Sequence, residues 1–243
     1  MKIFIVSLKN AESRRERVKR VLAELDVEFE FFDAINGFAG LPERLQGCPD
    51  DMHRKLLRSR PLTPGEKGCY ASHYLLWEKC IELNEPIIVL EDDFLPTRYF
   101  CDIFEALPKL HEKYEYLKLE PQIGDATALE YEHGIQTMLW HNNVRWTTGY
   151  SINPDGARKL VGCSSRWLCS VDNFIGESYR HKVQSVGVLP YAIYSPGDME
   201  SGIQNKVALA KVPLLFKASR EIYRFYRFVR MYFWNKKYKN QKG

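Results

Sequence analysis

The sequence predicts an α/β fold with a mixed central sheet and a separate C-terminal helix. In the first half, short apolar runs alternate with segments of helical periodicity, which is typical of a parallel sheet covered by helices. The second half contains several strand-like runs at closer spacing, and these favour a mixed sheet. Residues 206–243 are basic and aromatic, unlike the rest of the chain, which predicts an appended element.

The first elements are a strand over residues 2–8, a helix and a second strand over 27–32. The opening apolar run is too short for a secretory signal and has no cleavage site of small residues after it. Asn10 can cap the following helix, which we expect to reach about residue 25. Its buried face is predicted from the apolar residues at helical spacing, which are Val18, Val21, Leu22 and Leu25.

A clear helix start follows a loop with turn chemistry at 33–37 and a long irregular segment at 38–62. Thr63 can be the N-cap, Pro64 takes the first helical position, and Glu66 completes a capping box. The helix should extend to about residue 83 and place Trp77 in the core. It leads into the apolar strand that begins at residue 87.

The second half is predicted to add three strands, two helices and an edge strand. Residues 116–119, 135–140 and 144–152 have strand character. Asn153 and Pro154 favour a helix to about residue 161. Ser170 begins a further helix entrance, and 183–188 is expected to be an edge strand.

Composition and missing motifs exclude several protein classes. The chain is 45% hydrophobic and 13% aromatic, which fits a globular protein rather than a disordered one. No apolar stretch reaches the roughly 18 residues of a membrane-spanning helix. The six cysteines show no C-x-x-C pair and no Cys/His ligand spacing, so we expect reduced thiols, with neither a disulfide framework nor a zinc site. A P-loop and a dinucleotide-binding glycine fingerprint are absent, so a nucleotide would have to be held through a metal.

The most informative motif is a buried strand that ends in three consecutive acids. Residues 87–90 are wholly apolar, and Glu91, Asp92 and Asp93 follow at the carboxyl end, where ligands bind in open α/β sheets. Clustered carboxylates suit Mg²⁺ or Mn²⁺ carrying a phosphate. The motif alone is equally compatible with a strand that runs into a solvated acidic turn.

Several ordered blocks resemble glycosyltransferase family 25, which includes bacterial lipooligosaccharide galactosyltransferases and collagen galactosyltransferases. The resemblance covers residues 2–205 and rests on the segments IVSL at 5–8, RR at 14–15, DAING at 33–37, GEKGCYASH at 65–73, LEDD at 90–93 and GYSI at 149–152. It implies a GT-A type fold, a UDP-sugar donor, Mn²⁺ (or Mg²⁺) and inversion at the anomeric carbon. Lys67 departs from the apolar residue expected there, and the tail at 206–243 lies outside the resemblance. We therefore divide the chain into a GT-A type domain over 1–205 and a helical tail over 206–243.

The chemistry of transfer from a sugar nucleotide suggests roles for the acidic strand end, because a divalent cation would neutralise the charge of the donor diphosphate. Asp93 is the first choice for a direct metal ligand and Glu91 the second, while Asp92 would hold the ribose or the donor sugar. An inverting transfer needs a group that accepts the acceptor hydroxyl proton, and Asp172 is the candidate for this base. Asp172 could instead only cap a helix, which would stabilise it by about 1 kcal/mol. Asp198 and Asp155 are weaker alternatives for the base.

The remaining family blocks predict nucleotide-sugar contacts. The residues assigned to them are Ser7, Leu8, Arg14, Arg15, Asp33, Ser72 and His73. Ser7 and Leu8 end the first strand, near the expected base and ribose. One of the two arginines would reach the diphosphate, and Asp33 would bond uracil or ribose unless it only forms the turn. His73 is equally compatible with a packing role on its helix.

The tail carries a strong positive charge and two helical stripes. From Lys206 onward there are eleven Lys or Arg residues and one acid, whereas the preceding 205 residues carry 24 basic and 30 acidic residues. Arg220, Arg224 and Arg227 form a basic stripe, and the apolar stripe consists of Ile222, Phe225, Val229 and Tyr232. Basic, aromatic amphipathic helices associate with anionic membrane surfaces. A homodimer contact comes second, and a plain packed terminal helix is the remaining alternative.

Together these features predict a cytoplasmic enzyme that is peripherally associated with the inner membrane. It would transfer galactose from UDP-galactose to a sugar of a lipid-linked lipooligosaccharide or lipopolysaccharide core, in a β-linkage such as β-1,4. A UDP-glucose-dependent glucosyltransferase and a non-catalytic nucleotide-sugar-binding protein are the alternatives. Nucleic acid is not an expected partner, because the body is acidic and has no recognition motif.

Overall fold

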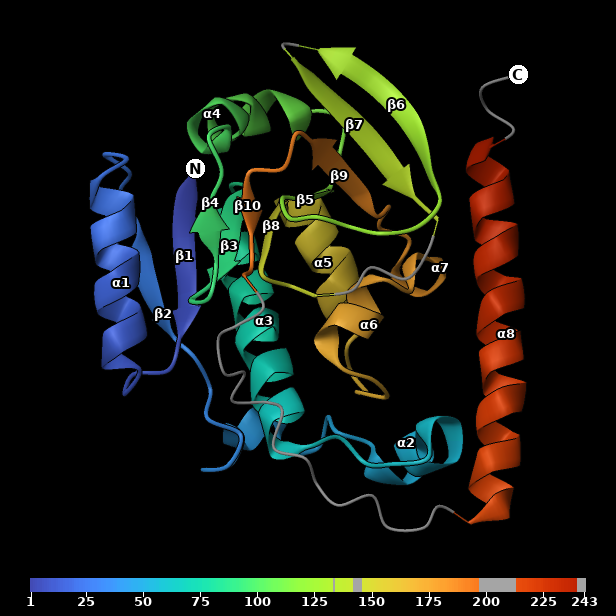
Figure 1. Cartoon of the computed structure of the whole chain (residues 1–243). Helices are drawn as coiled ribbons and strands as arrows, with labels where there is room; N and C mark the ends of the chain where they lie inside the picture. The colour runs from blue at the N-terminus through green and yellow to red at the C-terminus, as the bar shows by residue number, and fades with distance from the viewer. Residues whose placement is uncertain (133, 142–145, 197–212, 240–243) are drawn as a thin grey trace.

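The computed structural model describes residues 1–132, 134–141, 146–196 and 213–239. Within these ranges the chain forms a mixed sheet of eight strands in the order β2-β1-β3-β8-β5-β9-β7-β6, with helices on both faces (Figure 1). A two-stranded antiparallel sheet pairs β4 (Leu95–Pro96) with β10 (Ile193–Tyr194). The predicted α/β class with a mixed central sheet and a C-terminal helix is therefore confirmed.

The first half of the sheet is parallel. Strand β1 (Lys2–Ser7) lies between β2 (Glu30–Asp33) and β3 (Ile87–Glu91) and is parallel to both. Helix α1 (Glu12–Ala23) connects β1 to β2, and α3 (Pro64–Leu83) precedes β3. The alternation of strands and helices in the sequence indicated this arrangement.

The second half of the sheet mixes strand directions. Strand β8 (Gly149–Ile152) is antiparallel to both β3 and β5 (Tyr116–Lys118). Strand β9 (Val186–Leu189) is parallel to β5 and antiparallel to β7 (Ile135–Trp140), and β6 (Ala126–Glu132) closes this edge as a hairpin with β7.

The other elements connect and cover these strands. They are the 3₁₀ turn η1 (Glu43–Leu45) and the helices α2 (Asp51–Arg58), α4 (Phe100–Leu110), α5 (Pro154–Gly162), α6 (Val171–Ile175), α7 (Ser178–His181) and α8 (Leu214–Lys239).

Two apolar cores lie on opposite faces of the sheet. Alternate residues of β1 point to opposite faces, so Ile5 joins one core and Phe4 joins the other. The core on the Ile5 face contains α1 and α4, and the core on the Phe4 face contains α3, α5 and α6. These two layers of helices fix the carboxyl ends of β1 and β3 in place.

Local capping chemistry is confirmed at two helix starts. Thr63 accepts a hydrogen bond from the Glu66 amide, and the Glu66 carboxylate accepts one from the Thr63 amide, which completes the capping box of α3. Asn153 caps α5 by accepting from the Gly156 amide at 2.9 Å. Trp77 is fully buried, as predicted.

Several predictions about element boundaries are wrong. The N-cap of α1 is Ala11 rather than Asn10, and the helix ends at Ala23. The segment at 38–62 contains α2, whose N-cap Asp50 accepts from the His53 amide. Strand β9, predicted at an edge, lies between β5 and β7 because β6 and β7 extend the sheet beyond it. Strand β8 begins at 149 rather than 144, and α4 and β6 were not predicted.

Helix α8 packs along α2 and α7 (Figure 1). Arg227 forms an ion pair with the buried Glu177 at 2.6 Å, so one member of the predicted basic stripe points toward the body. Two hydrogen bonds from side chains to backbone carbonyls hold both ends of the helix. Ser59 donates to the Phe216 carbonyl at 3.1 Å, and Asn235 donates to the His141 carbonyl at 2.7 Å. Among the helices in the described ranges, none is long and apolar enough to cross a membrane.

Candidate active site

The site lies where the three parallel strands end. Strands β1, β2 and β3 share a direction, so Ser7, Asp33 and Glu91 at their carboxyl ends meet at one edge of the sheet. Asp92 and Asp93 follow Glu91 directly. The structure thus brings three separated sequence blocks together.

Asp92 is hydrogen-bonded by other side chains of the protein. Its carboxylate accepts a hydrogen bond from the Ser7 hydroxyl at 2.6 Å and one from the Arg14 guanidinium at 3.0 Å. Arg17 donates to the Asp92 carbonyl. Asp92 is buried, and its two carboxylate oxygens are both engaged. It therefore ties β3 to β1 and α1.

Glu91 is held by a chain of buried polar groups. Trp77 Nε1 donates to the Tyr150 hydroxyl at 2.9 Å, and that hydroxyl lies 2.9 Å from His73 Nδ1. His73 Nε2 lies 3.2 Å from Glu91 Oε1, which also accepts from Thr147 at 2.6 Å. Burial opposes ionisation of Glu91, but the hydrogen bonds from His73 and Thr147 outweigh it and lower its pKa. Glu91 is therefore a fixed carboxylate.

Asp93 differs from both of its neighbours. Ser195 donates to its Oδ2 at 3.3 Å, whereas its buried Oδ1 has no hydrogen-bond partner among the described residues. Burial and the charges of Glu91 and Asp92 raise the pKa of Asp93 to about 6. An under-bonded carboxylate oxygen in acidic surroundings suits a hard divalent cation. The residues present therefore fit Mn²⁺ or Mg²⁺, which Asp93 could hold.

A buried Lys–Glu pair lies beside this cluster. Lys118 donates to Glu120 at 2.8 Å and to the Trp146 carbonyl at 3.0 Å, and both charged side chains are almost fully buried. Burial lowers the pKa of Lys118 and raises that of Glu120. The pair was not among the predicted site residues, although Lys118 and Glu120 are charges at alternate positions of the otherwise apolar segment 116–120 and so gave a signal for it.

Asp172 faces the same region from the first turn of α6. Its charge contributes to the raised pKa of Cys69 and acts on Lys118, after the larger effect of burial in both cases. Asp155 lies at the opposite edge of the sheet, because it follows β8, whose Ile152 pairs with Ile87 at the start of β3. Asp155 also pairs with Arg158 at 2.7 Å. The other alternative, Asp198, lies outside the described residues.

Two more of the predicted nucleotide contacts form an ion pair at the end of β2. Arg15 pairs with Asp33 and also donates to the Ser7 carbonyl at 2.9 Å. The side chain of Asp33 is 57% exposed, so it remains open to a ligand. Leu8 is also partly exposed, at 37%.

Ser72 is occupied by backbone contacts. Its hydroxyl accepts from the Ile35 amide at 2.8 Å and donates to the Gly68 carbonyl at 2.8 Å, and the residue is fully buried. Ser72 therefore fixes the loop that follows β2.

Close backbone contacts at two glycines fix the position of the loop that follows β2. A Cβ on Gly37 would lie 1.8 Å from the Pro64 carbonyl oxygen, and one on Gly68 would lie 2.3 Å from the Ile35 carbonyl oxygen. Only glycine permits this approach. The loop after β2 is thereby held against the first turns of α3.

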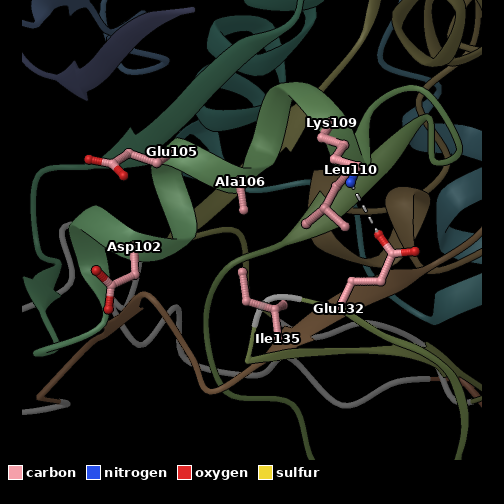
Figure 2. Close-up of a pocket in the computed structure, with 7 residues that line it drawn as sticks. All are labelled: Asp102, Glu105, Ala106, Lys109, Leu110, Glu132 and Ile135. Carbon is pink, nitrogen blue, oxygen red and sulfur yellow. Dashed lines mark ion pairs between the residues drawn. The ribbon is translucent and has the colours of Figure 1, made fainter.

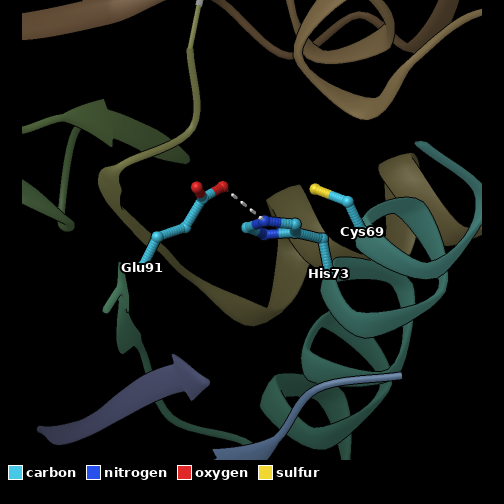
Figure 3. A group of neighbouring side chains, drawn as sticks. All are labelled: Cys69, His73 and Glu91. Carbon is cyan, nitrogen blue, oxygen red and sulfur yellow. Dashed lines mark hydrogen bonds and ion pairs between the residues drawn. The ribbon is translucent and has the colours of Figure 1, made fainter. Parts of the chain in front are cut away.

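Cys69, His73 and Glu91 form a compact group of possible metal ligands (Figure 3). One ligand atom from each lies within 4.8 Å of the other two. Cys69 and His73 are one helical turn apart on α3, so the expectation of no Cys/His ligand spacing in the sequence is wrong at this pair. All six cysteines, each within the described ranges, are free thiols.

A pocket elsewhere on the molecule contains none of the predicted site residues. It has a volume of about 300 Å³ and lies between α4 and the β6–β7 hairpin (Figure 2). Lys109 and Glu132 meet across it at 3.9 Å. Its remaining lining residues are Asp102, Glu105, Ala106, Leu110 and Ile135.

Comparison with known proteins identifies the family. Residues 1–175 match the model of glycosyltransferase family 25, described as an LPS biosynthesis protein. This match covers most of the chain, so the protein belongs to glycosyltransferase family 25. The resemblance inferred from the ordered blocks is confirmed.

Three relatives illustrate the range of this similarity. Procollagen galactosyltransferase 1-B of Xenopus laevis is 33% identical over 193 residues, which is 73% of this chain and 31% of the relative. Lipooligosaccharide biosynthesis protein lic2B of Haemophilus influenzae is 37% identical over 94 residues, 38% of this chain and 33% of that protein. Human inactive glycosyltransferase 25 family member 3 is 27% identical over 186 residues, 71% of this chain and 31% of that protein. The chain therefore spans about a third of the length of these relatives.

Proposed function

We propose that this protein is an inverting galactosyltransferase that transfers galactose from UDP-galactose to a sugar of a lipid-linked lipooligosaccharide or lipopolysaccharide core. The new bond would be a β-linkage such as β-1,4. Membership of the family and the galactosyltransferase names of relatives support the class of reaction. The match to lic2B supports the acceptor class.

The observation that carries the proposal is that Asp93 Oδ1, beside the fixed carboxylate of Glu91, has no hydrogen-bond partner among the described residues. These two residues would hold Mn²⁺ or Mg²⁺. When bound, the cation would neutralise charge on the donor diphosphate and so make UDP a better leaving group.

Asp172 is proposed as the general base. Its carboxylate would accept the proton of the acceptor hydroxyl as that oxygen attacks the anomeric carbon on the face opposite UDP. The C–O bond to the acceptor forms while the bond to the UDP oxygen breaks, which inverts the anomeric configuration. The electrostatic effect of its charge on Cys69 and on Lys118 supports this assignment.

The donor nucleotide is proposed to lie over the ends of β1 and β2. The exposed edges of Leu8 and Asp33 are open to the base and ribose. Arg15 would turn from Asp33 toward the diphosphate, since its side chain already lies at this edge. Arg14 holds the Asp92 side chain in place through a hydrogen bond, and Ser72 and His73 support the site through the loop after β2 and through Glu91.

We also propose that the outward face of α8 binds an anionic membrane surface. Seven large apolar residues of this helix are each more than half exposed, and they are Leu214, Leu215, Ile222, Phe225, Phe228, Tyr232 and Phe233. Most of them lie on the side of the helix opposite Arg227, which contacts the body. Exposed cations beside this face, including Lys217 and Arg224, would attract anionic lipid and repel a second copy of the helix. We therefore favour the membrane over a homodimer.

Liposome flotation tests the membrane proposal. The double variant Ile222→Glu/Phe225→Glu should lose binding to anionic vesicles. Ile123→Glu is a matched control, because Ile123 is 81% exposed on the body and should leave binding unchanged. Equal vesicle binding by the double variant and the wild type would contradict the proposal, and a monomer–dimer change on mutation would favour the homodimer instead.

A screen of UDP-sugar donors distinguishes a galactosyltransferase from a glucosyltransferase and from a non-catalytic nucleotide-sugar-binding protein. Purified protein is incubated with lipooligosaccharide core, Mn²⁺ and each UDP-sugar in turn, with EDTA as the control, and the product linkage is read by NMR. The proposal predicts UDP release with UDP-galactose that EDTA abolishes. Preference for UDP-glucose would support a glucosyltransferase. No turnover with any donor, together with retained nucleotide binding, would support a non-catalytic protein such as the name of the human inactive relative describes.

A further inference from the structure

We propose that Cys69, His73 and Glu91 form a second metal site, one selective for a thiophilic divalent cation such as Zn²⁺. The three side chains offer a sulfur, an imidazole nitrogen and a carboxylate oxygen within 4.8 Å of one another (Figure 3). This mixed donor set differs from the all-oxygen set expected for Mn²⁺ or Mg²⁺ at Asp93.

The backbone already presents the ligands on rigid elements. Cys69 and His73 lie four residues apart on α3, so both side chains point from the same face of one helix. Glu91 reaches the group from the end of β3, with His73 Nε2 and Glu91 Oε1 only 3.2 Å apart. Zinc bonds of roughly 2.0 to 2.3 Å require ligand atoms about 3 to 4 Å apart. The pair of His73 Nε2 and Glu91 Oε1 meets this requirement at 3.2 Å, and the Cys69 sulfur lies within 4.8 Å of a ligand atom of each residue.

The supporting contacts are those of a metal-binding histidine. Such a histidine uses one ring nitrogen for the metal and the other for a hydrogen bond that fixes its orientation. His73 Nδ1 already contacts the Tyr150 hydroxyl at 2.9 Å, and Trp77 donates to that same hydroxyl. His73 would bind the cation through Nε2 as its proton moves to Nδ1.

Cation binding would also release the thiol proton of Cys69 to solvent, because thiolate is the form that binds metal. Three protein ligands leave the fourth tetrahedral position open to water. The side chain of Glu91 is 26% exposed, so the cation could reach the group from solvent at this residue.

Metal binding at this group would affect turnover because Glu91 belongs to both proposed metal sites. If Glu91 also serves the donor metal at Asp93, occupation of the thiophilic site removes one of its oxygens from that role. Zn²⁺ would then inhibit transfer even with excess Mn²⁺. This consequence rests on the proposed function, whereas metal binding itself does not.

Cobalt titration tests the site without any turnover. Co²⁺ replaces Zn²⁺ in tetrahedral sites, and its thiolate ligation gives a charge-transfer absorption band. We expect this band in the wild type at one equivalent of Co²⁺ and its displacement by Zn²⁺. Cys69→Ser should abolish the band and weaken Zn²⁺ binding, measured by calorimetry, by roughly 100-fold or more.

A control variant, a folding check and a second ligand variant accompany the cobalt titration. Cys163 is exposed and away from this group, so Cys163→Ser should retain both the band and the affinity. Circular dichroism checks that Cys69→Ser remains folded, and His73→Gln provides a second variant that should lose calorimetric zinc binding. Absence of the band in the wild type, or its loss in Cys163→Ser but not in Cys69→Ser, would overturn the proposal. Zinc binding without inhibition of transfer would retain the site and reject the shared role of Glu91.

Discussion

Replacing Asp93 by asparagine should stabilise the metal-free protein. Burial and two neighbouring carboxylates raise the pKa of Asp93 from 3.8 to about 6. Between these two pH values the folded state binds more protons than the unfolded state, so the free energy of unfolding falls as the pH rises. Each pH unit corresponds to about 1.4 kcal/mol. Near pH 7 the ionised side chain therefore costs roughly 3 kcal/mol, and Asp93→Asn removes most of this cost while keeping the shape.

The matched control is the adjacent residue. Asp92 accepts from Ser7 at 2.6 Å and from Arg14 at 3.0 Å, so Asp92→Asn breaks a buried, charge-assisted pair. It should lower the free energy of unfolding by roughly 2 kcal/mol. Two neighbouring, chemically identical substitutions are thus expected to have opposite signs.

Urea denaturation in the presence of EDTA measures both effects. In a parallel series with Mn²⁺, the wild type should gain stability, by about 2.7 kcal/mol when the cation is at 100 times its dissociation constant. Asp93→Asn should gain little. A destabilised Asp93→Asn in EDTA, or an equal gain from Mn²⁺ in the variant and the wild type, would refute the argument that Asp93 is held ready for a cation.

Three further predictions concern stability. Gly37→Ala places a methyl group 1.8 Å from the Pro64 carbonyl oxygen and should cost roughly 3 kcal/mol in thermal or urea unfolding, whereas Gly47→Ala, with open space around it, should stay within about 0.5 kcal/mol. Burial lowers the pKa of His111 from 6.5 to about 4. Between these two pH values the unfolded chain therefore binds a proton on His111 that the folded chain does not bind. Acidification from pH 6.5 to 4 should therefore cost the wild type up to about 3 kcal/mol more than His111→Gln, and equal acid sensitivity would contradict this. Glu177→Gln leaves Arg58, Arg180 and Arg227 without their buried anionic partner, so it should lower the free energy of unfolding by roughly 3 kcal/mol and make α8 more sensitive to protease. An unchanged digestion pattern would argue against the Arg227–Glu177 ion pair as the contact that anchors α8.

The sequence predicted those parts of the fold that depend on neighbouring residues. The capping box at Thr63 and Glu66 and the cap at Asn153 are local hydrogen-bond patterns, and both were found where expected. The apolar strand before Glu91 was equally clear. Helix α4 was not predicted, because it has no capping side chain at Tyr99 and contains Pro108.

Features that depend on distant packing could not be predicted. Strand β9 has the composition of an edge strand, yet β7 pairs with it, and nothing in the strand itself specifies that partner. The stripes of α8 were visible, but the sequence did not show that Arg227 would face the body. That orientation depends on Glu177, which is fifty residues earlier and wholly buried.

The sequence pointed to the residues of the candidate site, but it did not show which contacts each of them makes. The acids at 91–93 were identified as a group, and the structure separates them by their partners. Asp92 is engaged by Ser7 and Arg14, and Glu91 by His73 and Thr147. Within the part of the chain that the structure describes, Asp93 alone of the three acids keeps a buried oxygen without a hydrogen-bond partner. Burial decides these differences, and burial depends on the whole fold.

The most direct test of the central claim is the rate of galactose transfer by Asp93→Asn. Wild type and variant are compared at equal folded concentration, with UDP-galactose, lipooligosaccharide core and saturating Mn²⁺, by following UDP release. The account predicts EDTA-sensitive transfer in the wild type and its loss in the folded variant. Full Mn²⁺-dependent transfer by Asp93→Asn would contradict the assignment of the acidic strand end as the metal site.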